Sequence, residues 1–323
     1  MQIVWICTKI CETLKSVEMT VKIFNITHKP CRLFGSDDII TINAGRSVAS
    51  ARSKDGNLAQ SDLEWLEKNT LSDATGDNIS EFNRYCNEMT AIYWVWKNYD
   101  KVGNPDFVGF MHYRRHFILT DKLKFQDSYE KTLGLTKENL ERLTEQYDLI
   151  TPPFVQIKKS CISQNFGTLG KNKVREVIDI ALDIIKVRYP SDYKKVVSIL
   201  QGHNTGSFYN MFIMKKELFF EYCEWIFPIL FDLDKKLGRD NYEDGQERCI
   251  GWTAEMLTSI FIYMKSGECS HKEVLVFNQD PSCRCTLKNF IIACLKLPFV
   301  RGRKRQKYKG RIYNYILQER YGN

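Results

Sequence analysis

The chain has 323 residues, of which 43% are hydrophobic and 27% are charged, and its formal net charge is +8 at pH 7. This length and apolar content predict a folded globular protein with one large α/β domain or two smaller ones, and they exclude a disordered or fibrous chain. The positive charge favours anionic partners such as nucleotides, lipid phosphates or nucleic acid, but it is equally typical of an ordinary lysine-rich surface.

The cysteines and the apolar segments indicate the compartment. Eleven cysteines occur without a CxxC pair, and the opening "MQIVWICTKICETLK" lacks the basic start of a secretion signal and is interrupted by Lys9. We therefore expect reduced thiols in a cytoplasm. No run of about 18 apolar residues is found, so the sequence predicts a soluble or membrane-peripheral protein.

The first predicted strand covers residues 21–26 and ends in the polar residues Thr27, His28 and Lys29. A strand that ends in this way is expected to deliver a loop to a ligand site, so these three residues are candidate contacts of an anion or nucleotide. The preceding residues 1–18 are expected to be an N-terminal appendage.

The clearest helical pattern lies within residues 76–101, with Ser80 as the predicted N-cap. Apolar residues recur at helical spacing and are expected in the core: Phe82, Cys86, Met89, Tyr93 and Trp96. A second, more polar line has the spacing to face a cleft: Asn83, Asn87, Thr90, Trp94 and Lys97.

Further along the chain, strand and helix patterns alternate. We expect strands at 107–111, in "YDLITPPF", in "FYNMFIMKK" and in "KEVLVF", and helices at 137–146, within 172–200, at 217–238 across Pro228, and at 253–264. Such alternation predicts an α/β domain with a mostly parallel sheet flanked by helices, and ligands of such domains gather at the carboxyl ends of the strands.

The strand at 107–111 is followed by His112, Tyr113, Arg114 and Arg115. Two guanidinium groups at the end of an inner strand form a natural clamp for a diphosphate, because each donates a planar pair of hydrogen bonds. The alternative is a structural network in which both arginines pair with carboxylates. Since neighbouring residues of a strand face opposite sides, at most one arginine is expected to point into a cleft.

The C-terminal segment 281–323 has a different composition. An apolar stretch, "NFIIACLKLPFV", precedes seven basic residues between 301 and 311 without an intervening acidic residue. Adjoining apolar and basic blocks favour association with an anionic membrane surface; a solvated tail and a nucleic-acid contact are the competing interpretations.

Several of these segments, in this order, resemble a family of bacterial capsule and exopolysaccharide proteins that was long labelled a domain of unknown function. The motifs are "TGDNIS", "MTAIYWVWKN", "VGFMHYRRHF", "NMFIMKKELFFEYCEWIFPIL" and "GWTAEML", over roughly residues 20–280. The resemblance implies a glycosyltransferase with a GT-A-like, Rossmann-like α/β fold, and some members are identified as galactofuranosyltransferases.

The resemblance also assigns roles to residues. It implies that Glu255 is a catalytic base beside the sugar platform Trp252. The alternative, from the position of Glu255 in the first turn of its helix, is that it only complements the dipole of that helix. Asp77 is the other catalytic candidate. Glu88 and Trp94 are expected near the acceptor, and Asn78 near the donor.

GT-A enzymes usually end a central strand in an Asp-x-Asp motif that holds Mn²⁺ or Mg²⁺ on the donor diphosphate, whereas here that strand ends in His112 to Arg115. The Asp232-x-Asp234 sequence is expected on the surface of a helix instead. Either arginine charge replaces the metal, or His112 is an unusual metal ligand.

The sequence therefore predicts three parts: an appendage at 1–18, a GT-A-like domain at 19–280, and a membrane-associating tail at 281–323. The predicted function is transfer of a hexose from a nucleoside-diphosphate sugar, expected to be UDP-linked, to a lipid-linked surface polysaccharide at the inner face of the cell membrane. The alternatives are a non-catalytic nucleotide-sugar or glycan-binding module and a nucleic-acid-binding protein, for which no recognised motif appears.

Overall fold

The computed structural model describes residues 19–49, 58–157, 161–162, 173–238 and 248–322, so the predicted appendage at 1–18 lies outside the described residues. The strands are β1 Val21–Thr27, β2 Ile39–Asn43, β3 Leu71–Ser72, β4 Phe107–His112, β5 Arg115–Ile118, β6 Leu149–Thr151, β7 Val155–Gln156, β8 Thr205–Gly206, β9 Phe212–Lys215, β10 His271–Glu273 and β11 Leu275–Asn278.

The α-helices are α2 Gln60–Asn69, α3 Asn83–Cys86, α4 Met89–Lys97, α5 Tyr129–Leu133, α6 Lys137–Thr144, α8 Lys173–Arg188, α9 Pro190–Gly202, α10 Lys216–Leu237, α11 Cys249–Lys265, α12 Leu287–Lys296 and α13 Gly302–Tyr321. The 3-10 helices are η1 Arg46–Val48, η2 Ser80–Phe82, η3 Tyr99–Val102, η5 Pro281–Cys283 and η6 Leu297–Phe299.

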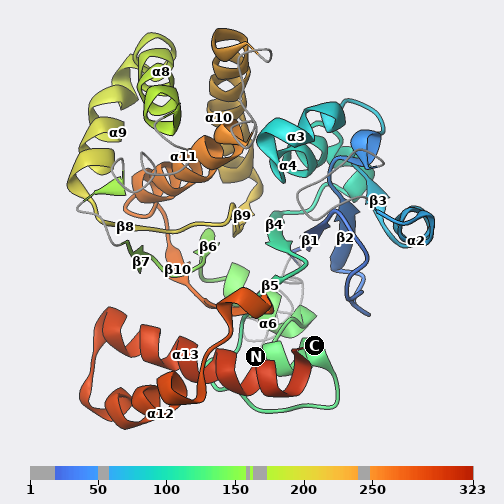
Figure 1. Ribbon diagram of the computed structural model, residues 1–323, viewed down its shortest axis with the longest axis vertical. Helices are drawn as coiled ribbons and strands as arrows, with labels where there is room; N and C mark the ends of the chain where they lie inside the picture. Colours follow the sequence, from blue (N-terminus) through green and yellow to red (C-terminus); the bar gives the residue numbers. More distant parts are fainter. Residues whose placement is uncertain (1–18, 50–57, 158–160, 163–172, 239–247, 323) are drawn as a thin grey trace, which may run out of the picture.

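The central sheet has the strand order β10-β6-β9-β4-β1-β2-β3 (Figure 1). Strand β1 runs parallel to both β2 and β4, and the β2–β3 and β10–β6 pairs are also parallel. Strand β9 runs antiparallel to its neighbours β4 and β6. The predicted α/β fold with a mostly parallel central sheet is confirmed; β9 is reversed within this order, and β5 joins the sheet through antiparallel pairs with β4 and β11.

Two hydrophobic clusters cover the two faces of this sheet. Phe24 and Phe110 point to the face that packs on α4, α8, α10 and α11, whereas Ile23 and Met111 point to the face that packs on α5, α6, β11 and α13. Because both faces are covered, neighbouring residues of β1 and β4 are equally apolar, as expected of inner strands. Apart from Lys22 and the buried Asn25 of β1, polar side chains appear where these strands end.

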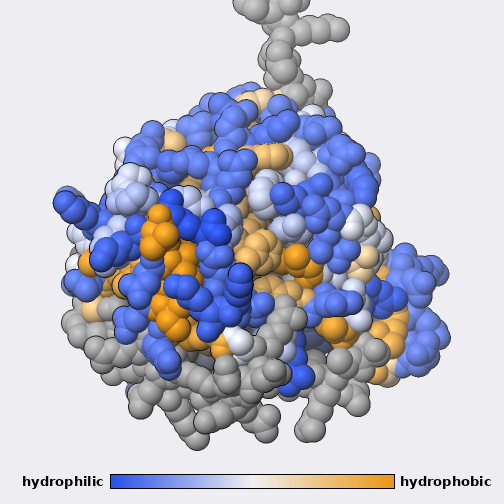
Figure 2. Space-filling view, turned by 90° about the horizontal axis from the view of Figure 1, so that it is seen from above, coloured by the Kyte–Doolittle hydropathy of each residue, from blue (hydrophilic) through white to orange (hydrophobic). Residues whose placement is uncertain are grey.

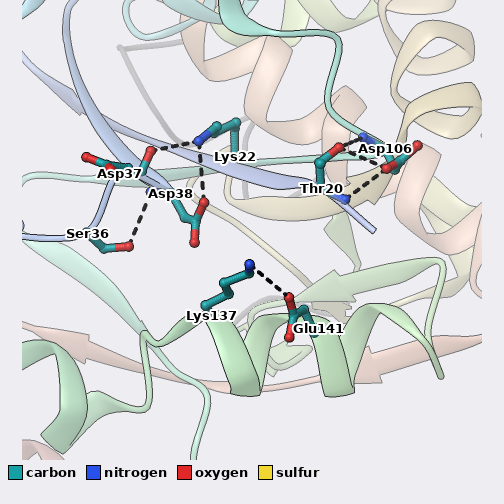
Figure 3. Close-up of polar contacts among 8 residues, drawn as sticks. All are labelled: Thr20, Lys22, Ser36, Asp37, Asp38, Asp106, Lys137 and Glu141. Atoms are coloured by element: carbon teal, nitrogen blue, oxygen red, sulfur yellow. Dashed lines mark hydrogen bonds and ion pairs between the residues drawn. The ribbon is translucent and has the colours of Figure 1, made fainter. Parts of the chain in front are cut away.

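Hydrogen bonds hold β1 in place at the end opposite to its polar residues (Figure 3). The Asp106 carboxylate accepts from both the backbone N–H and the hydroxyl of Thr20 at 2.8 Å, and the pKa of this carboxyl is lowered chiefly by the backbone bond. The Lys22 ammonium lies 3.3 Å from Asp38 Oδ1. These contacts align the amino ends of β1, β2 and β4, so that their carboxyl ends meet at one edge.

The prediction of one continuous helix over residues 80–97 is wrong. The segment instead forms η2, α3 and α4, and the break falls at Asn87, whose φ is +53°. The Asn83 side chain donates to the Asn87 carbonyl at 2.7 Å, and the Asn87 side chain accepts from Arg248 at 2.9 Å. These contacts stabilise the positive φ of Asn87, which is combined with a ψ of −132° and is uncommon for a residue other than glycine. The predicted core stripe is nevertheless buried, except for the partly exposed Trp96.

Ser80 does not cap a helix, contrary to the prediction, because its hydroxyl donates to Asp73 Oδ1 at 2.6 Å. Asp73 is fully buried and also accepts from the backbone N–H groups of Gly45 and Arg46, at 2.7 and 2.9 Å. This carboxylate therefore joins the loops that follow β2 and β3 at the carboxyl edge of the sheet.

Replacement of Asp73 by Ala is expected to destabilise the protein by about 3 kcal/mol or more, since it leaves two backbone donors and one hydroxyl without their acceptor in a buried place. The exposed Asp77 accepts one side-chain hydrogen bond, from Tyr93, so Asp77→Ala is the matched control with a small effect. Urea unfolding of the two variants measures the difference; equal losses would contradict this role of Asp73.

The predicted basic tail is a helical hairpin that packs against the sheet. The Asn314 side chain donates to the Val276 carbonyl and accepts from the Asn278 N–H, and Leu317 is fully buried. Helix α12 packs on α13 through the stacked rings of Phe290 and Tyr315, whose centroids are 4.5 Å apart. In Figure 1 the hairpin lies at the end of the molecule opposite to α8, α9 and α10.

The opposite end, viewed in Figure 2, has a mainly hydrophilic surface with strips of hydrophobic residues between the charged ones. Within the described residues, no helix is long and apolar enough to cross a membrane.

Candidate functional site

The segment His112 to Arg115 forms the tight turn between β4 and β5. His112 and Arg115 are cross-strand partners, and Tyr113 and Arg114 occupy the turn between them. The Tyr113 N–H donates to the Ile26 carbonyl at 3.0 Å, which holds the turn against the end of β1. The hairpin thus places His112 and Arg115 on one side and leaves Tyr113 and Arg114 beside the loop after β1.

Tyr209 connects three charged or polar side chains at this edge. His112 Nε2 lies 2.5 Å from the Tyr209 carbonyl, and the Tyr209 N–H donates to Glu255 Oε1 at 2.6 Å. The Arg115 guanidinium lies 4.5 Å from the centroid of the Tyr209 ring. Because a carbonyl only accepts, His112 carries its proton on Nε2.

A second carboxylate, Glu88, belongs to the same group. Glu88 Oε1 accepts from the Asn210 side chain at 2.8 Å, and Asn210 Oδ1 accepts from the Thr258 hydroxyl at 2.7 Å. Glu88 precedes α4 and Glu255 lies on α11, so two carboxylates from distant parts of the chain meet next to residues 209 and 210. Both residues have positive φ, +80° for Tyr209 and +50° for Asn210. For a tyrosine this conformation is strained, and such strain concentrates at functional sites.

The pKa of the Glu255 carboxyl is raised to about 7, first by burial and then by the neighbouring Glu88, while Arg115 and Arg248 oppose the shift. Burial also lowers the pKa of His112, so the imidazole is neutral at pH 7 although Glu88 acts in the opposite direction. The residues His112, Arg115, Glu88 and Glu255 are all partly exposed. A carboxyl that titrates near neutral pH is suited to general base catalysis.

A cationic and aromatic group adjoins these residues across the turn. Around the Tyr113 ring lie the His28 ring, with centroids 5.2 Å apart, Lys29 Nζ at 5.5 Å and the Arg114 guanidinium at 5.0 Å. Thr27 is buried, and its hydroxyl donates to the Lys29 carbonyl at 2.5 Å, so it shapes the loop. These residues surround the end of β1 with positive charge.

The two arginines differ in their partners. Arg114 forms an ion pair with Asp280 at 3.1 Å, whereas Arg115 forms none in the described part of the chain. The expectation that at most one arginine points into a cleft stays a prediction, and its premise of adjacent strand positions is wrong, because Arg114 lies in the turn. Arg115 is therefore the guanidinium that is available to an anionic ligand.

Other predicted site residues lie apart from this group. Asp77 is exposed and accepts from the Tyr93 hydroxyl at 3.1 Å. Trp94 is only 4% exposed and donates to the Thr75 carbonyl at 2.6 Å, so its ring packs in the core and offers no open face to a sugar. Asn78 lines a separate surface pocket of about 420 Å³ that also contains Glu81 and Asp234.

Trp252 lies one helical turn from Glu255 on α11 and is partly buried against the core. Of the two predicted tryptophans of the acceptor site, it is the one nearer in sequence to a member of the carboxylate pair. Its role as a sugar platform stays a prediction.

Sequence reasoning missed Tyr209, Asn210 and Arg248. All three contact predicted residues, yet "FYNMF" reads as the start of a strand, and only the positive φ values reveal its special backbone. The Asn in that stretch was the available signal, because asparagine tolerates the left-handed region.

Possible metal ligands are the acidic, cysteine and imidazole side chains in the part of the chain that the structure describes. Among these residues, no group of three or more His, Cys, Asp or Glu side chains is arranged to hold a metal ion. Asp232 of the Asp-x-Asp sequence pairs with Arg188 on the surface of α10, in agreement with the expectation of a helix surface.

Fold and site together define an α/β protein with a carboxylate pair, a neutral histidine and an arginine without an ion pair among the described residues, at the carboxyl edge of its sheet. The chain belongs to the family described as Domain of unknown function (DUF4422), whose model matches residues 22–266. The predicted resemblance to a family labelled a domain of unknown function is thereby confirmed, whereas its link to capsule and exopolysaccharide synthesis stays a prediction. Comparison with the curated proteins gives no match.

Among solved structures, the chain is similar to WbbM, a bifunctional glycosyltransferase in its apo form, with a TM-score of 0.65 and 29% sequence identity. The match covers 80% of this chain and 45% of that one, so this chain spans less than half of the length of WbbM.

Proposed function

We propose that the protein is a glycosyltransferase that transfers a hexose from a nucleoside-diphosphate sugar to a glycan acceptor. The observation that carries the proposal is the position of Glu255 beside Arg115 and His112, at the edge where α/β sheets bind their ligands. The similarity to WbbM, a bifunctional glycosyltransferase, supports the same reaction class.

The chemistry can be assigned to residues of this chain. An acceptor hydroxyl attacks the anomeric carbon, a new C–O bond forms, and the bond from that carbon to the diphosphate breaks. Glu255, when ionised, takes the proton of the hydroxyl. The leaving diphosphate gains negative charge, which Arg115 stabilises, together with Lys29 and Arg114 at the end of β1. His112, held neutral, positions Tyr209 through its carbonyl.

We infer that these cations supply the charge stabilisation that Mn²⁺ or Mg²⁺ provides in other enzymes of this kind. The donor is expected to be UDP-linked, with galactofuranose as the first sugar to try, because the family resemblance implies it. The acceptor is proposed to be a lipid-linked capsular, exo- or O-polysaccharide at the inner face of the cell membrane.

Thermal unfolding of the protein with UDP, GDP, CDP or ADP, each with EDTA or with Mn²⁺, tests the donor and the metal. A nucleotide at 100 times its Kd stabilises the folded state by about 2.7 kcal/mol, which raises the Tm of a chain of this length by about 4 °C. We expect UDP to produce this shift equally with EDTA and with Mn²⁺. A shift only with Mn²⁺ would overturn the metal-free inference, and no shift with any nucleotide would contradict the proposed donor class.

Turnover is tested by release of UDP from UDP-galactofuranose in the presence of an acceptor glycan. Nucleotide binding without turnover on any acceptor would favour a binding module over an enzyme.

A further inference from the structure

The outer face of α12 carries a stripe of exposed hydrophobic side chains. Leu287, Ile291 and Leu295 recur every four residues and are 56%, 47% and 68% exposed, and Phe299 continues the stripe at 88%. The described part of the chain exposes ten large hydrophobic side chains, and four of them lie in this short hairpin. The hairpin follows the residues that match the family model.

The stripe faces away from the rest of the protein. Helix α12 packs on α13 through Phe290, which stacks on Tyr315, and through Ala293, which is fully buried. Residues 290 and 293 lie on the opposite side of the helix from 295 at helical spacing. Packing therefore explains the inner face of α12 and leaves its outer face without a partner among the described residues.

The positive charge of the whole chain is concentrated in the same segment. Residues 281–323 contain eleven Lys and Arg residues against one acidic residue, Glu319, which makes the segment +10. The other 280 residues carry 36 basic and 38 acidic residues, so they are −2. Five basic residues follow the stripe directly and are exposed: Arg301, Arg303, Lys304, Arg305 and Lys307.

We propose that the α12–α13 hairpin binds the surface of an anionic lipid bilayer, with the stripe of Leu287, Ile291, Leu295 and Phe299 in the interface and the five basic residues on lipid phosphates. Exposed apolar and basic side chains that follow one another along the chain suit such a bilayer, because aliphatic burial and phosphate attraction act together. A nucleic acid would use the basic residues but would leave the aliphatic stripe in water. The inference rests on the proposed function in one respect, since a lipid-linked acceptor lies in that membrane.

Flotation of the full chain with vesicles tests this proposal, using phosphatidylcholine alone and phosphatidylcholine with 30% phosphatidylglycerol. We expect binding to the anionic vesicles only. Lys304→Glu with Lys307→Glu should weaken it at least tenfold, because each basic residue near such a surface strengthens binding roughly fivefold. Leu295→Ser with Phe299→Ser should also weaken binding to the anionic vesicles. A high salt concentration should not restore the binding that this variant loses.

Matched control variants come from the opposite end of the molecule. Lys235→Glu with Lys236→Glu reverses two exposed charges on α10, and Val187→Ser removes an 80% exposed apolar side chain from α8. These controls should bind the anionic vesicles as the unmodified chain does. Equal losses in hairpin and control variants, or equal binding to neutral vesicles, would overturn the proposal.

Two further measurements separate the possible failures. UDP release with a water-soluble acceptor should be unchanged in the hairpin variants, so loss of vesicle binding with normal turnover supports the membrane role independently of catalysis. Absence of vesicle binding together with normal turnover would sink the membrane proposal and leave the proposed function standing. A third outcome would assign the hairpin to nucleic acid instead. In that case the protein binds an oligonucleotide tightly but not vesicles, and Leu295→Ser with Phe299→Ser leaves the oligonucleotide binding intact.

Discussion

Glu255→Gln is expected to lower the turnover of sugar transfer by about 100- to 10,000-fold, the usual contribution of a positioned general base. Glutamine still accepts the hydrogen bond from the Tyr209 N–H, so the geometry of the site should survive while the proton acceptor is lost. The pKa of Glu255 is about 7 in the folded protein, so the unmodified enzyme should lose activity as the pH falls through about 7. Initial rates from pH 5 to pH 9, with both substrates saturating, measure this.

The same substitution should change stability in the opposite direction. The folded-state pKa of Glu255 is raised above its ordinary value of 4.5, so its favourable contribution to folding is present below pH 4.5 and is lost as the pH rises through about 7. Glu255→Gln should therefore stabilise the protein at pH 8, by at most about 3 kcal/mol, and should have little effect at pH 4. Urea unfolding at the two pH values checks the sign.

Two companion variants make the assignment specific. Asp77→Asn alters the other catalytic candidate, which is exposed and lies apart from the group, and it should keep near-normal turnover. Glu88→Gln removes the neighbouring charge that raises the pKa of Glu255, so the acid side of the rate profile should move to lower pH. If Glu255→Gln retained turnover and Asp77→Asn lost it, the base would be Asp77.

Arg115→Ala is expected to lower kcat/KM by about 100-fold or more, because it removes the guanidinium that we assign to the departing diphosphate. Arg115→Lys should recover only part of the loss, since a lysine cannot donate the planar pair of hydrogen bonds. The charge of Arg115 also lowers the pKa of Glu255, so its removal should raise that pKa. As the pH is lowered, the residual activity should therefore begin to decrease at a higher pH than in the unmodified enzyme.

Arg114→Ala is the matched control for Arg115→Ala. Arg114 is already paired with Asp280, so its loss should reduce kcat/KM less and should leave the pH profile almost unchanged. The Tm shift with UDP should shrink in both variants and most in Arg115→Ala. Equal kcat/KM for Arg115→Ala and the unmodified enzyme would remove Arg115 from the site.

Local sequence patterns were enough to predict the inner strands, the long helices and the polar ends of β1 and β4. Local patterns suffice for these, because a run such as "FVGFM" is apolar on both faces only if helices cover both, and periodic spacing marks the buried side of a helix. The cluster from His112 to Arg115 was visible for a related reason: charged residues that directly follow a buried strand stand at the edge where an α/β sheet meets its ligand.

The grouping of the charged residues, in contrast, follows from contacts between distant parts of the chain. Glu88 and Glu255 are 167 positions apart, and no local pattern indicates that residues 209 and 210 bring them together. The break at Asn87 likewise depends on Arg248, far along the chain, which stabilises a backbone conformation that helical propensity alone disfavours. The sequence pattern predicted that Trp94 faces a cleft, but contact with the Thr75 loop buries it. The periodicity of a sequence indicates which side of a helix or strand is apolar. Packing between distant segments determines which charged groups become neighbours, and therefore which pKa is raised and which arginine has no ion pair among the described residues.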